Sequence, residues 1–337
     1  MILADFEKRV TQWDVARKAG VSRTQVSYVV AGSSHAMSDD VRRRILEAID
    51  TLGYHSNKSA QKLRKGIGEY VSNLFGLVVS GPEVFSNPFC AKIIASLHSA
   101  AFEKGCKIHF IRFFEELGDT LLFNTLIHPD EIGGLILLDL DKASSGDKNG
   151  IIMEKIRSRI KNTVCVEWKN PLFPCVCFDR YKSGCVAVDH LWGKGYTSIG
   201  YVGPVDQRLS GIRDQMVKNR ISVDGMIMRG AHTMSDGFDV ARTLVSEGNL
   251  PSALICGFDE IAAGMLLFFN RENISVPKSV AVMGMGDSEI SRFTNPPLTT
   301  MGIKIAEISQ TVIDMLTGGP YDSDSILPAE LIPRLST

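Results

Sequence analysis

One short stretch of the sequence places hydrogen-bonding side chains on a single helix face. From Arg23 to Tyr28 the chain reads R-T-Q-V-S-Y, which offers a guanidinium, hydroxyls, an amide and an aromatic ring instead of the Glu/Lys mixture of an ordinary solvated helix. Such groups hydrogen-bond to base edges and phosphates in a DNA major groove. Because a short motif carries little weight alone, a small helical hairpin with a solvated polar face is the alternative.

Two short helices around a tight turn are expected to position these residues. Thr11 can cap the first helix, with Asp14 as the reciprocal partner of a capping box. Gly20 can adopt positive φ where this helix ends, and Ser22 can cap the second helix. The expected buried faces are Val15, Ala16 and Ala19 in the first helix and Val26, Val29 and Val30 in the second. The pattern predicts a helix-turn-helix whose second helix has the size of a major-groove element.

The following residues supply a third helix and then a basic segment. Ser38 can cap this helix and Gly53 can end it. Its expected buried face comprises Val41, Ile45, Ala48, Ile49 and Leu52. The arginines at 42–44 form either a solvated face or a phosphate contact. Residues 57–66 form either a flexible linker or a short helix that becomes ordered with DNA and a second copy of the chain.

Charge is unevenly distributed along the 337 residues. Residues 1–66 hold twelve Lys or Arg against seven Asp or Glu, a net of +5, which leaves −6 for the rest of a chain whose net charge is −1. A basic first fifth on an acidic body indicates that the N-terminal part alone holds a polyanionic partner.

The composition excludes several other classes of protein. The chain is 44% hydrophobic and 22% charged, no apolar run approaches the roughly 20 residues that cross a bilayer, and the N-terminal residues lack a secretion signal. Its seven cysteines form an odd set without a C-x-x-C pair, in mostly apolar surroundings, which indicates reduced buried thiols. We therefore expect a cytoplasmic, nucleoid-associated protein that needs no metal or cofactor.

No residue spacing typical of an enzyme is present. The sequence contains no Walker loop, no G-x-G-x-x-G after a first strand, no H-E-x-x-H and no Ser/His/Asp arrangement. His98, His109 and His190 occur in apolar patterns, so we expect them to be packed histidines. The sequence thus predicts a protein that is not an enzyme.

From residue 70 onward apolar strands alternate with helices. Strands are predicted at 75–80, 108–113, 134–138, 164–168, 176–178, 198–202, 226–229, 253–256 and 280–283. Helices are predicted between them, for instance at 91–105, 151–161, 183–194, 236–247, 259–270 and 304–316. This alternation indicates parallel sheets covered by helices on both faces. Since nine strands exceed one such sheet, we predict an α N-terminal headpiece followed by two doubly wound α/β lobes.

Several short segments then occur in a characteristic order. They are D-V-A-R-K-A-G-V-S-R-T-Q-V-S-Y-V-V (14–30), L-G-Y-H-S-N-K-S-A-Q-K-L (52–63), S-N-P-F (86–89), D-R-Y-K-S-G-C-V-A-V-D-H-L-W-G-K-G-Y (179–196), G-P (203–204), R-L-S-G (208–211), V-P-K-S-V-A-V-M-G (276–284) and P-P-L-T-T (296–300). Each segment is weak alone, but their order and spacing form a strong signal. Nearly all of the chain resembles the lac repressor/galactose repressor (LacI/GalR) family of bacterial transcription regulators.

The resemblance implies a domain organisation. It comprises a helix-turn-helix DNA-binding domain at 1–56, a hinge helix at 57–68 and an effector-binding and dimerisation core at 69–337. Two lobes of periplasmic-binding-protein type would form the core, the first about 69–172 and 303–320 and the second about 173–302 and 321–337. A small effector would bind between the lobes and change the pairing of the hinge helices, which couples effector binding to operator binding.

The resemblance also implies how DNA is contacted. In a homodimer each second helix would enter a major groove of a palindromic operator, and the paired hinge helices would wedge Leu63 into the minor groove. Arg23, Thr24 and Tyr28 would face bases, and Ser22, Gln25 and Ser27 would hold phosphates. Thr11, Trp13, Asn57 and Ala60 complete the predicted contacts. The family often has Arg at the position of Tyr28 and Asn at that of Ala31, so either the operator is unusual or Tyr28 only packs.

Effector contacts are implied at Phe89, Trp168, Asp179, Arg208 and Asp259. Arg208 matches a family arginine that binds effector hydroxyls or carboxylates, with a surface salt bridge as its alternative. Each aspartate either faces the ligand at a strand end or is only a helix N-cap. The two aromatic residues either stack on a ligand ring or belong to the core.

One position departs from the family. Gly286 stands where the family usually has an aspartate that grips sugar hydroxyls, and we expect the adjacent Asp287 to point elsewhere. A different ligand, a weak site or control by another protein therefore stays open beside the family's sugar or related polar metabolite.

Together these features predict a sequence-specific DNA-binding transcriptional regulator, a repressor rather than an activator, that responds to a small effector. The alternative is a ligand-binding receptor of periplasmic-binding type without DNA output. The segment 327–337 contains two prolines and no heptad pattern, so we expect homodimers rather than coiled-coil tetramers.

Overall fold

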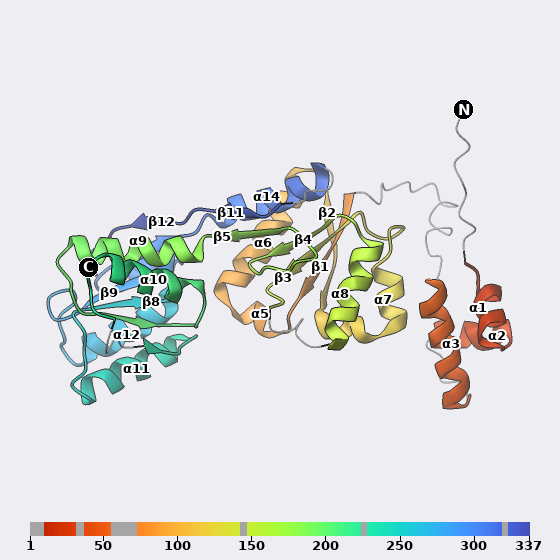
Figure 1. The fold of residues 1–337 in the computed structure, drawn as a ribbon, viewed down its shortest axis with the longest axis horizontal. Coiled ribbons are helices and arrows are strands. Elements are labelled where there is room, and N and C mark those ends of the chain that lie inside the picture. The colour runs from red at the N-terminus through yellow and green to blue at the C-terminus, as the bar shows by residue number, and fades with distance from the viewer. Residues whose placement is uncertain (1–9, 32–36, 55–72, 142–146, 224–227, 319–322) are drawn as a thin grey trace. The chain divides into compact units, whose positions relative to one another are not determined.

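The described chain forms two compact units. A computed structural model describes residues 10–31, 37–54, 73–141, 147–223, 228–318 and 323–337 (Figure 1). Unit 1 comprises 1–87, 94–176 and 309–324, and unit 2 comprises 88–93, 177–308 and 325–337. The chain therefore crosses at 176/177, 308/309 and 324/325, a few residues after the lobe boundaries expected from the sequence, and 88–93 form an additional excursion.

The headpiece of unit 1 consists of three helices, as expected. These are α1 (Gln12–Ala19), α2 (Arg23–Val30) and α3 (Asp39–Leu52). Their shared core comprises Val15, Ala16, Ala19, Val26, Val29, Ile45, Ala48, Ile49 and Tyr54, with Val30, Val41 and Leu52 packed against it. Gly20 has φ 64° and Gly53 has φ 62°, which confirms that glycine ends α1 and α3. The proposed hinge at 57–68 lies outside the described residues.

The first sheet has the order β11-β5-β4-β3-β1-β2. Its strands are β1 (Leu74–Val79), β2 (Lys107–Phe113), β3 (Gly134–Leu138), β4 (Thr163–Val166), β5 (Cys175–Phe178) and β11 (Ser325–Leu327). The helices along this part of the chain are α5 (Glu83–Ser86), α6 (Pro88–Glu103), η2 (Phe114–Gly118), α7 (Thr120–Leu126), α8 (Asp147–Arg159) and α14 (Ile305–Gly318). The pairs β1–β2, β1–β3, β3–β4 and β4–β5 are parallel, as predicted.

The second sheet has the order β12-β10-β9-β8-β6-β7. Its strands are β6 (Ile199–Val202), β7 (Met228–Arg229), β8 (Ala253–Cys256), β9 (Ala281–Gly286), β10 (Thr299–Gly302) and β12 (Glu330–Ile332). Its helices are α9 (Arg180–Gly193), α10 (Gln207–Lys218), α11 (Met234–Ser246), α12 (Asp259–Arg271) and α13 (Ile290–Phe293). Only β12 is paired antiparallel, with β10.

Both faces of the second sheet are buried, each in its own core. Ile255 packs with residues of α9 and α10, whereas its neighbours Leu254 and Cys256 pack with residues of α11 and α12. Successive strand side chains point to opposite faces, so the continuous apolar strands of the sequence supply both cores at once.

Reciprocal glycines bring the helices of each face into close contact. A Cβ on Gly211 would lie 2.0 Å from the Tyr181 carbonyl oxygen, and one on Gly184 would lie 2.3 Å from that of Arg208. On the other face, Gly237 and Gly264 have the same relation to Ile261 and Met234. The first pair holds the N-terminal parts of α9 and α10 together. Asp179 is the N-cap of α9, and Arg208 lies in the first turn of α10.

Several expectations about the body need correction. β10, β11 and β12 were not predicted, because they are short and two of them lie in a proline-containing segment. His98 and His109 are exposed on α6 and the edge strand β2, so the expectation of packed histidines is wrong for both, whereas His190 is half-buried. All seven cysteines are buried and outside any disulfide, which confirms the expected buried thiols. Among the described helices, none is both long and apolar enough to cross a membrane.

Candidate functional site

Both helices of the helix-turn-helix begin with a reciprocal cap. Asp14 accepts from the backbone N–H of Thr11 at 2.9 Å, and Thr11 Oγ1 accepts from that of Asp14 at 3.4 Å. Gln25 Oε1 accepts from the N–H of Ser22 at 3.0 Å, and Ser22 Oγ accepts from that of Gln25 at 3.2 Å. These bonds satisfy N–H groups that a helix start leaves unpaired. The predicted caps are therefore confirmed, and Gln25 has the additional role of partner in the second one.

The predicted contact face of α2 is open at its start. Ser22, Arg23 and Thr24 are exposed, whereas Gln25, Ser27 and Tyr28 are half-buried. Thr11 is exposed as well, and the Trp13 side chain of α1 is 63% exposed. The start of α2 and the indole thus form the accessible part of the predicted DNA contacts. Asn57, Ala60 and Leu63 lie outside the described residues.

Arg23 contacts two residues of α1. Its Nε donates to Gln12 Oε1 at 3.3 Å, and its guanidinium carbon lies 5.8 Å from the centroid of the Trp13 ring. A cation at this distance from an indole face is weakly attracted to it. The most exposed cation of α2 is therefore held by α1.

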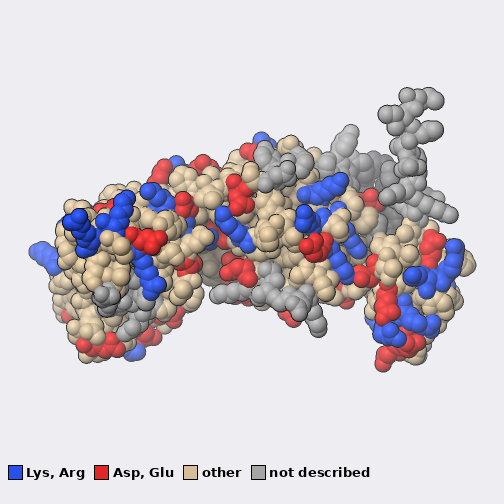
Figure 2. Space-filling model, viewed as in Figure 1, with Lys and Arg blue, Asp and Glu red and all other residues tan. Residues whose placement is uncertain are grey.

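The arginines at 42–44 are largely paired within the headpiece. Arg43 binds Asp40 at 2.6 Å and Glu47 at 2.9 Å, and Arg44 donates to the Ala19 carbonyl at 3.1 Å. Figure 2 accordingly shows acidic and basic side chains close together on the headpiece. Of the two alternatives, the solvated and internally neutralised face is favoured for Arg43 and Arg44.

In unit 2 the predicted effector arginine is buried rather than at the surface. Arg208 is 4% exposed, and its Nε and Nη2 groups donate to Asp206 at 3.1 and 2.6 Å. Its Nη1 donates to the Gly257 carbonyl, and its guanidinium lies over the Phe258 ring at 4.8 Å. The alternative of a surface salt bridge is therefore wrong, because the ion pair is interior and stacked.

Asp206 also lies near a second arginine. The carboxylate caps α10 by accepting from the N–H of Arg208 at 2.9 Å, and Arg180 Nε approaches it at 4.0 Å. The Arg180 guanidinium in turn stacks over Phe178 at 4.7 Å. Asp206 thus accepts from the Arg208 guanidinium and lies at ion-pair distance from that of Arg180, and each guanidinium lies over a phenyl ring.

The two predicted aspartates have different surroundings. Asp179 caps α9, since its carboxylate accepts from the N–H of Lys182 at 2.8 Å. Asp259 is not a cap, because the cap of α12 is Phe258. It is 0% exposed and accepts from Thr300 Oγ1 and, at 2.6 Å, from the N–H of Ser288. Burial raises the pKa of Asp259 to about 6. The N-cap alternative for Asp259 is therefore wrong in this structure, where its carboxylate ties the loop after β9 to β10. Its effector contact stays a prediction.

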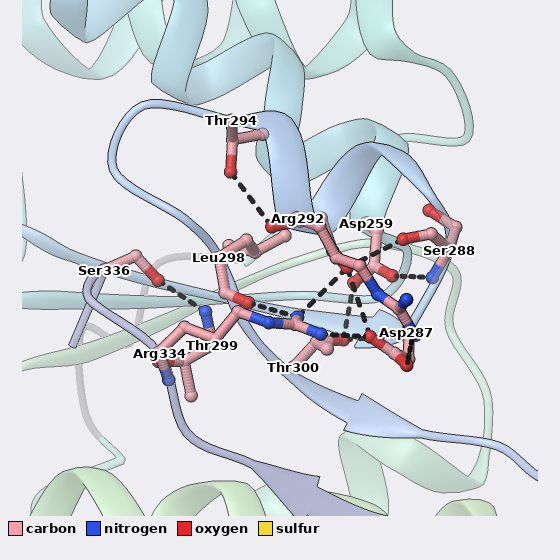
Figure 3. A network of polar contacts seen from close by, with 11 residues as sticks. Asp259, Asp287, Ser288, Arg292, Thr294, Leu298, Thr299, Thr300, Arg334 and Ser336 are labelled. Carbon is pink, nitrogen blue, oxygen red and sulfur yellow. Dashed lines mark hydrogen bonds and ion pairs between the residues drawn. The ribbon is translucent and has the colours of Figure 1, made fainter.

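Asp287 points away from Gly286, as expected. Its carboxylate accepts from Arg334, Ser291 and Arg292, and these side chains form the network in Figure 3. Burial opposes the charge of Asp287, but the hydrogen bonds from the two arginines lower its pKa overall. Gly286 itself has φ 134°, a backbone conformation that a side chain rarely adopts. The aspartate missing at position 286 is therefore not replaced by its neighbour.

Phe89 and Trp168, the two aromatic residues predicted to contact the effector, belong to different units. Phe89 is half-buried and packs edge-on against Phe178, with ring centroids 6.0 Å apart, so it belongs to the unit that contains Arg208. Trp168 belongs to unit 1, is 6% exposed and donates its indole N–H to the Leu137 carbonyl at 3.0 Å. The structure favours the core alternative for Trp168.

Four residues of these sites were missed in the sequence: Gln12, Arg180, Asp206 and Phe258. Only Asp206 had a signal in the sequence, since it is an acidic residue two positions before Arg208. Gln12, Arg180 and Phe258 each contact a residue well separated from them along the chain, and no local pattern reveals such a contact. In the described part of the chain no cluster of three His, Cys, Asp or Glu could hold a metal ion.

Two family models match the chain. Residues 11–57 match bacterial regulatory proteins of the lacI family, and residues 188–337 match a periplasmic binding protein-like domain. The chain therefore combines a lacI-family DNA-binding domain with a periplasmic binding protein-like domain. It is thus a DNA-binding transcriptional regulator and not an enzyme, as predicted.

Members of the lacI family match along most of the chain. The ribose operon repressor of Escherichia coli strain K12 is 27% identical over 319 residues, covering 91% of this chain and 92% of that repressor. The HTH-type transcriptional repressor PurR of Haemophilus influenzae is 24% identical over 310 residues, covering 90% of this chain and 89% of PurR.

Solved structures of the lacI family share the fold. The lac repressor dimer bound to operator and the anti-inducer ONPF is 25% identical, with a TM-score of 0.69 over 98% of this chain and 99% of that one. A regulator from Enterococcus faecium with bound ribose is 20% identical, with a TM-score of 0.64 over 78% of this chain and 98% of that one. The lobes are therefore of periplasmic-binding-protein type.

Proposed function

We propose that this protein is a homodimeric repressor that binds a palindromic operator and is regulated by a small effector. The observation that carries the proposal is the capped helix-turn-helix, which exposes Arg23 and Thr24 in the segment that matches the lacI family. A receptor without DNA output has no use for this headpiece, so that alternative is set aside.

Arg23, Thr24 and Tyr28 would contact bases, whereas Ser22, Gln25 and Ser27 would hold phosphates. The additional contacts of Thr11 and Trp13, and those of the hinge at Asn57, Ala60 and Leu63, remain predictions. A DNA target places the protein in the cytoplasm at the nucleoid.

Dimer formation is supported by α6. Phe102 is 82% exposed, and Ala95, His98 and Ser99 are exposed on the same helix face. Packing of the exposed Phe102 ring against a second copy would remove its apolar surface from water. The related lac repressor is a dimer on its operator. We therefore assign this face of α6 to contact with a second copy.

The effector would bind at the carboxyl edge of the second sheet, near Arg208, Asp179 and Phe89. Relatives are a ribose operon repressor and a ribose-bound regulator, which favours a sugar-sized polar effector. Trp168 is left out of this set because it is buried and hydrogen-bonded internally, and the effector contact of Asp259 stays a prediction.

The experiment is selection of fragments of the host genome by the purified full-length protein at low salt. The expected result is enrichment of a few fragments that share one palindrome. The double variant Arg23→Ala, Thr24→Ala serves as the control and should enrich none of them. Recovery of random fragments by the wild-type protein would contradict the proposal.

A further inference from the structure

Gln12 lies on α1, outside the helix that contacts bases, yet it joins that helix to the headpiece core. Its Oε1 accepts from Arg23 Nε at 3.3 Å. Burial raises the pKa of Tyr54, and the Gln12 side chain and the nearby charge of Arg23 partly offset that rise. Tyr54 is part of the headpiece core. Gln12 is therefore a link between a buried anchor and an exposed guanidinium.

The hydrogen bond to Gln12 restrains the Nε side of the Arg23 guanidinium and leaves the Nη side available to DNA. The hydrogen bond uses Nε, and Trp13 lies beside the guanidinium plane at 5.8 Å. The two Nη groups have no partner among the described residues. An arginine recognises guanine through two parallel N–H groups aimed at O6 and N7, which requires the guanidinium plane to have one orientation. Holding Nε on one side, with the indole ring nearby, restricts that orientation.

An untethered arginine at the start of a helix would sample many rotamers. Ordering it on DNA would then reduce the affinity gained from each contact. It would also let the guanidinium move to a neighbouring phosphate, which carries no sequence information. The contact with Gln12 opposes both effects because it is already formed in the free protein.

We propose that Gln12 is a positioning residue for base recognition, which holds Arg23 so that it selects one guanine in each half-site. This inference rests on the proposed operator binding. Gln12 acts through Arg23 and need not touch DNA itself.

The test compares base preferences on a half-site library derived from the palindrome that the wild-type protein selects. Gln12→Ala should reduce the preference for guanine at one position by about tenfold and leave the other positions within about twofold. Arg23→Ala should lose the preference at the same position. In the Arg23→Ala background, Gln12→Ala should cause no further change.

Two further variants separate positioning from simple stabilisation. Gln12→Glu keeps an acceptor for Nε, so it should retain the guanine preference even though its negative charge lowers overall affinity. Lys18→Ala removes an exposed positive charge from the same helix, so it should lower the affinity for every DNA sequence by the same factor. Thermal unfolding of each variant shows that the headpiece stays folded.

Three results would overturn the inference. Gln12→Ala could weaken every sequence equally, it could leave the guanine preference intact, or it could still change base preference when Arg23 is absent, which would mean that Gln12 contacts the base. Failure of the wild-type protein to select any palindrome would instead count against the proposed function.

Discussion

At the scale of single residues, two neighbouring carboxylates of unit 2 have opposite electrostatic surroundings. Asp259 is buried with neutral donors, and burial raises its pKa to about 6. Asp287 lies between Arg334 and Arg292, whose hydrogen bonds lower its pKa. The folded state therefore favours the protonated form of Asp259 and the ionised form of Asp287, so the two groups affect stability in different pH ranges.

We predict that Asp259 makes the protein less stable as pH rises from about 4 to 6. Within this window the carboxyl is protonated in the folded state and ionised in the unfolded state, so the free energy of unfolding falls. A shift of about two pKa units corresponds to roughly 3 kcal/mol. Asp287 contributes below this window, where its stabilisation is lost as pH falls.

Urea unfolding at several pH values checks this for the wild type and Asp259→Asn. The stability difference between wild type and variant should decline from pH 4 to pH 7. A difference that is constant with pH would show that Asp259 ionises normally in the folded protein.

At the scale of elements, close helix contacts position the candidate site residues of unit 2. α9 and α10 approach through Gly184 and Gly211, and this approach places Arg180, Asp206 and Arg208 in one cluster. Here the contact is backbone against backbone, so no side-chain rotation can relieve an added methyl group.

We predict that Gly211→Ala lowers the free energy of unfolding by about 3 kcal/mol, the upper part of the range for overpacking. A Cβ at this position would lie 2.0 Å from the Tyr181 carbonyl oxygen. The matched control is Gly150→Ala in α8, where nothing lies within 4 Å, and alanine should be neutral or stabilising there. Equal stability of the two variants would contradict the assigned packing.

The elements that the sequence predicted are those with local signals. The headpiece helices carry caps and glycine stops within a few residues, and β3 and β8 are apolar runs with the predicted bounds. β10 and β12 depend on pairing with each other across about 30 residues, which no local pattern reveals. The residues of the candidate site likewise divide into those with a local sequence signal and those without one. Arg208 stood in a motif, whereas its contacts Gly257 and Phe258 come from another strand end far along the chain.

At the scale of the whole molecule, the proposed dimer would bring together two DNA-binding headpieces and two ligand-binding cores. A palindrome has two half-sites, so a monomer would lose most of the affinity that two linked headpieces provide. If α6 forms the proposed dimer interface, its exposed face would affect DNA binding by linking the two headpieces.

We predict that Phe102→Asp converts dimers to monomers and reduces operator affinity by at least a hundredfold. A carboxylate at this position would be buried between the two copies without a partner. Analytical ultracentrifugation measures the first effect and fluorescence anisotropy with labelled operator measures the second. As a control, Val217→Asp introduces a charge at an exposed apolar position of α10. Stable dimers of Phe102→Asp would exclude this face of α6 as the interface.

The most direct test of sequence-specific DNA binding is the affinity ratio between the selected palindrome and a scrambled duplex of equal length, measured across salt concentrations. We predict a ratio of at least about 10³ near physiological salt, with affinity for both duplexes falling steeply as salt rises because phosphate contacts release counterions. Arg23→Ala should lower the ratio while leaving binding to the scrambled duplex nearly unchanged. Equal affinity of the wild-type protein for the two duplexes at every salt concentration would contradict the account.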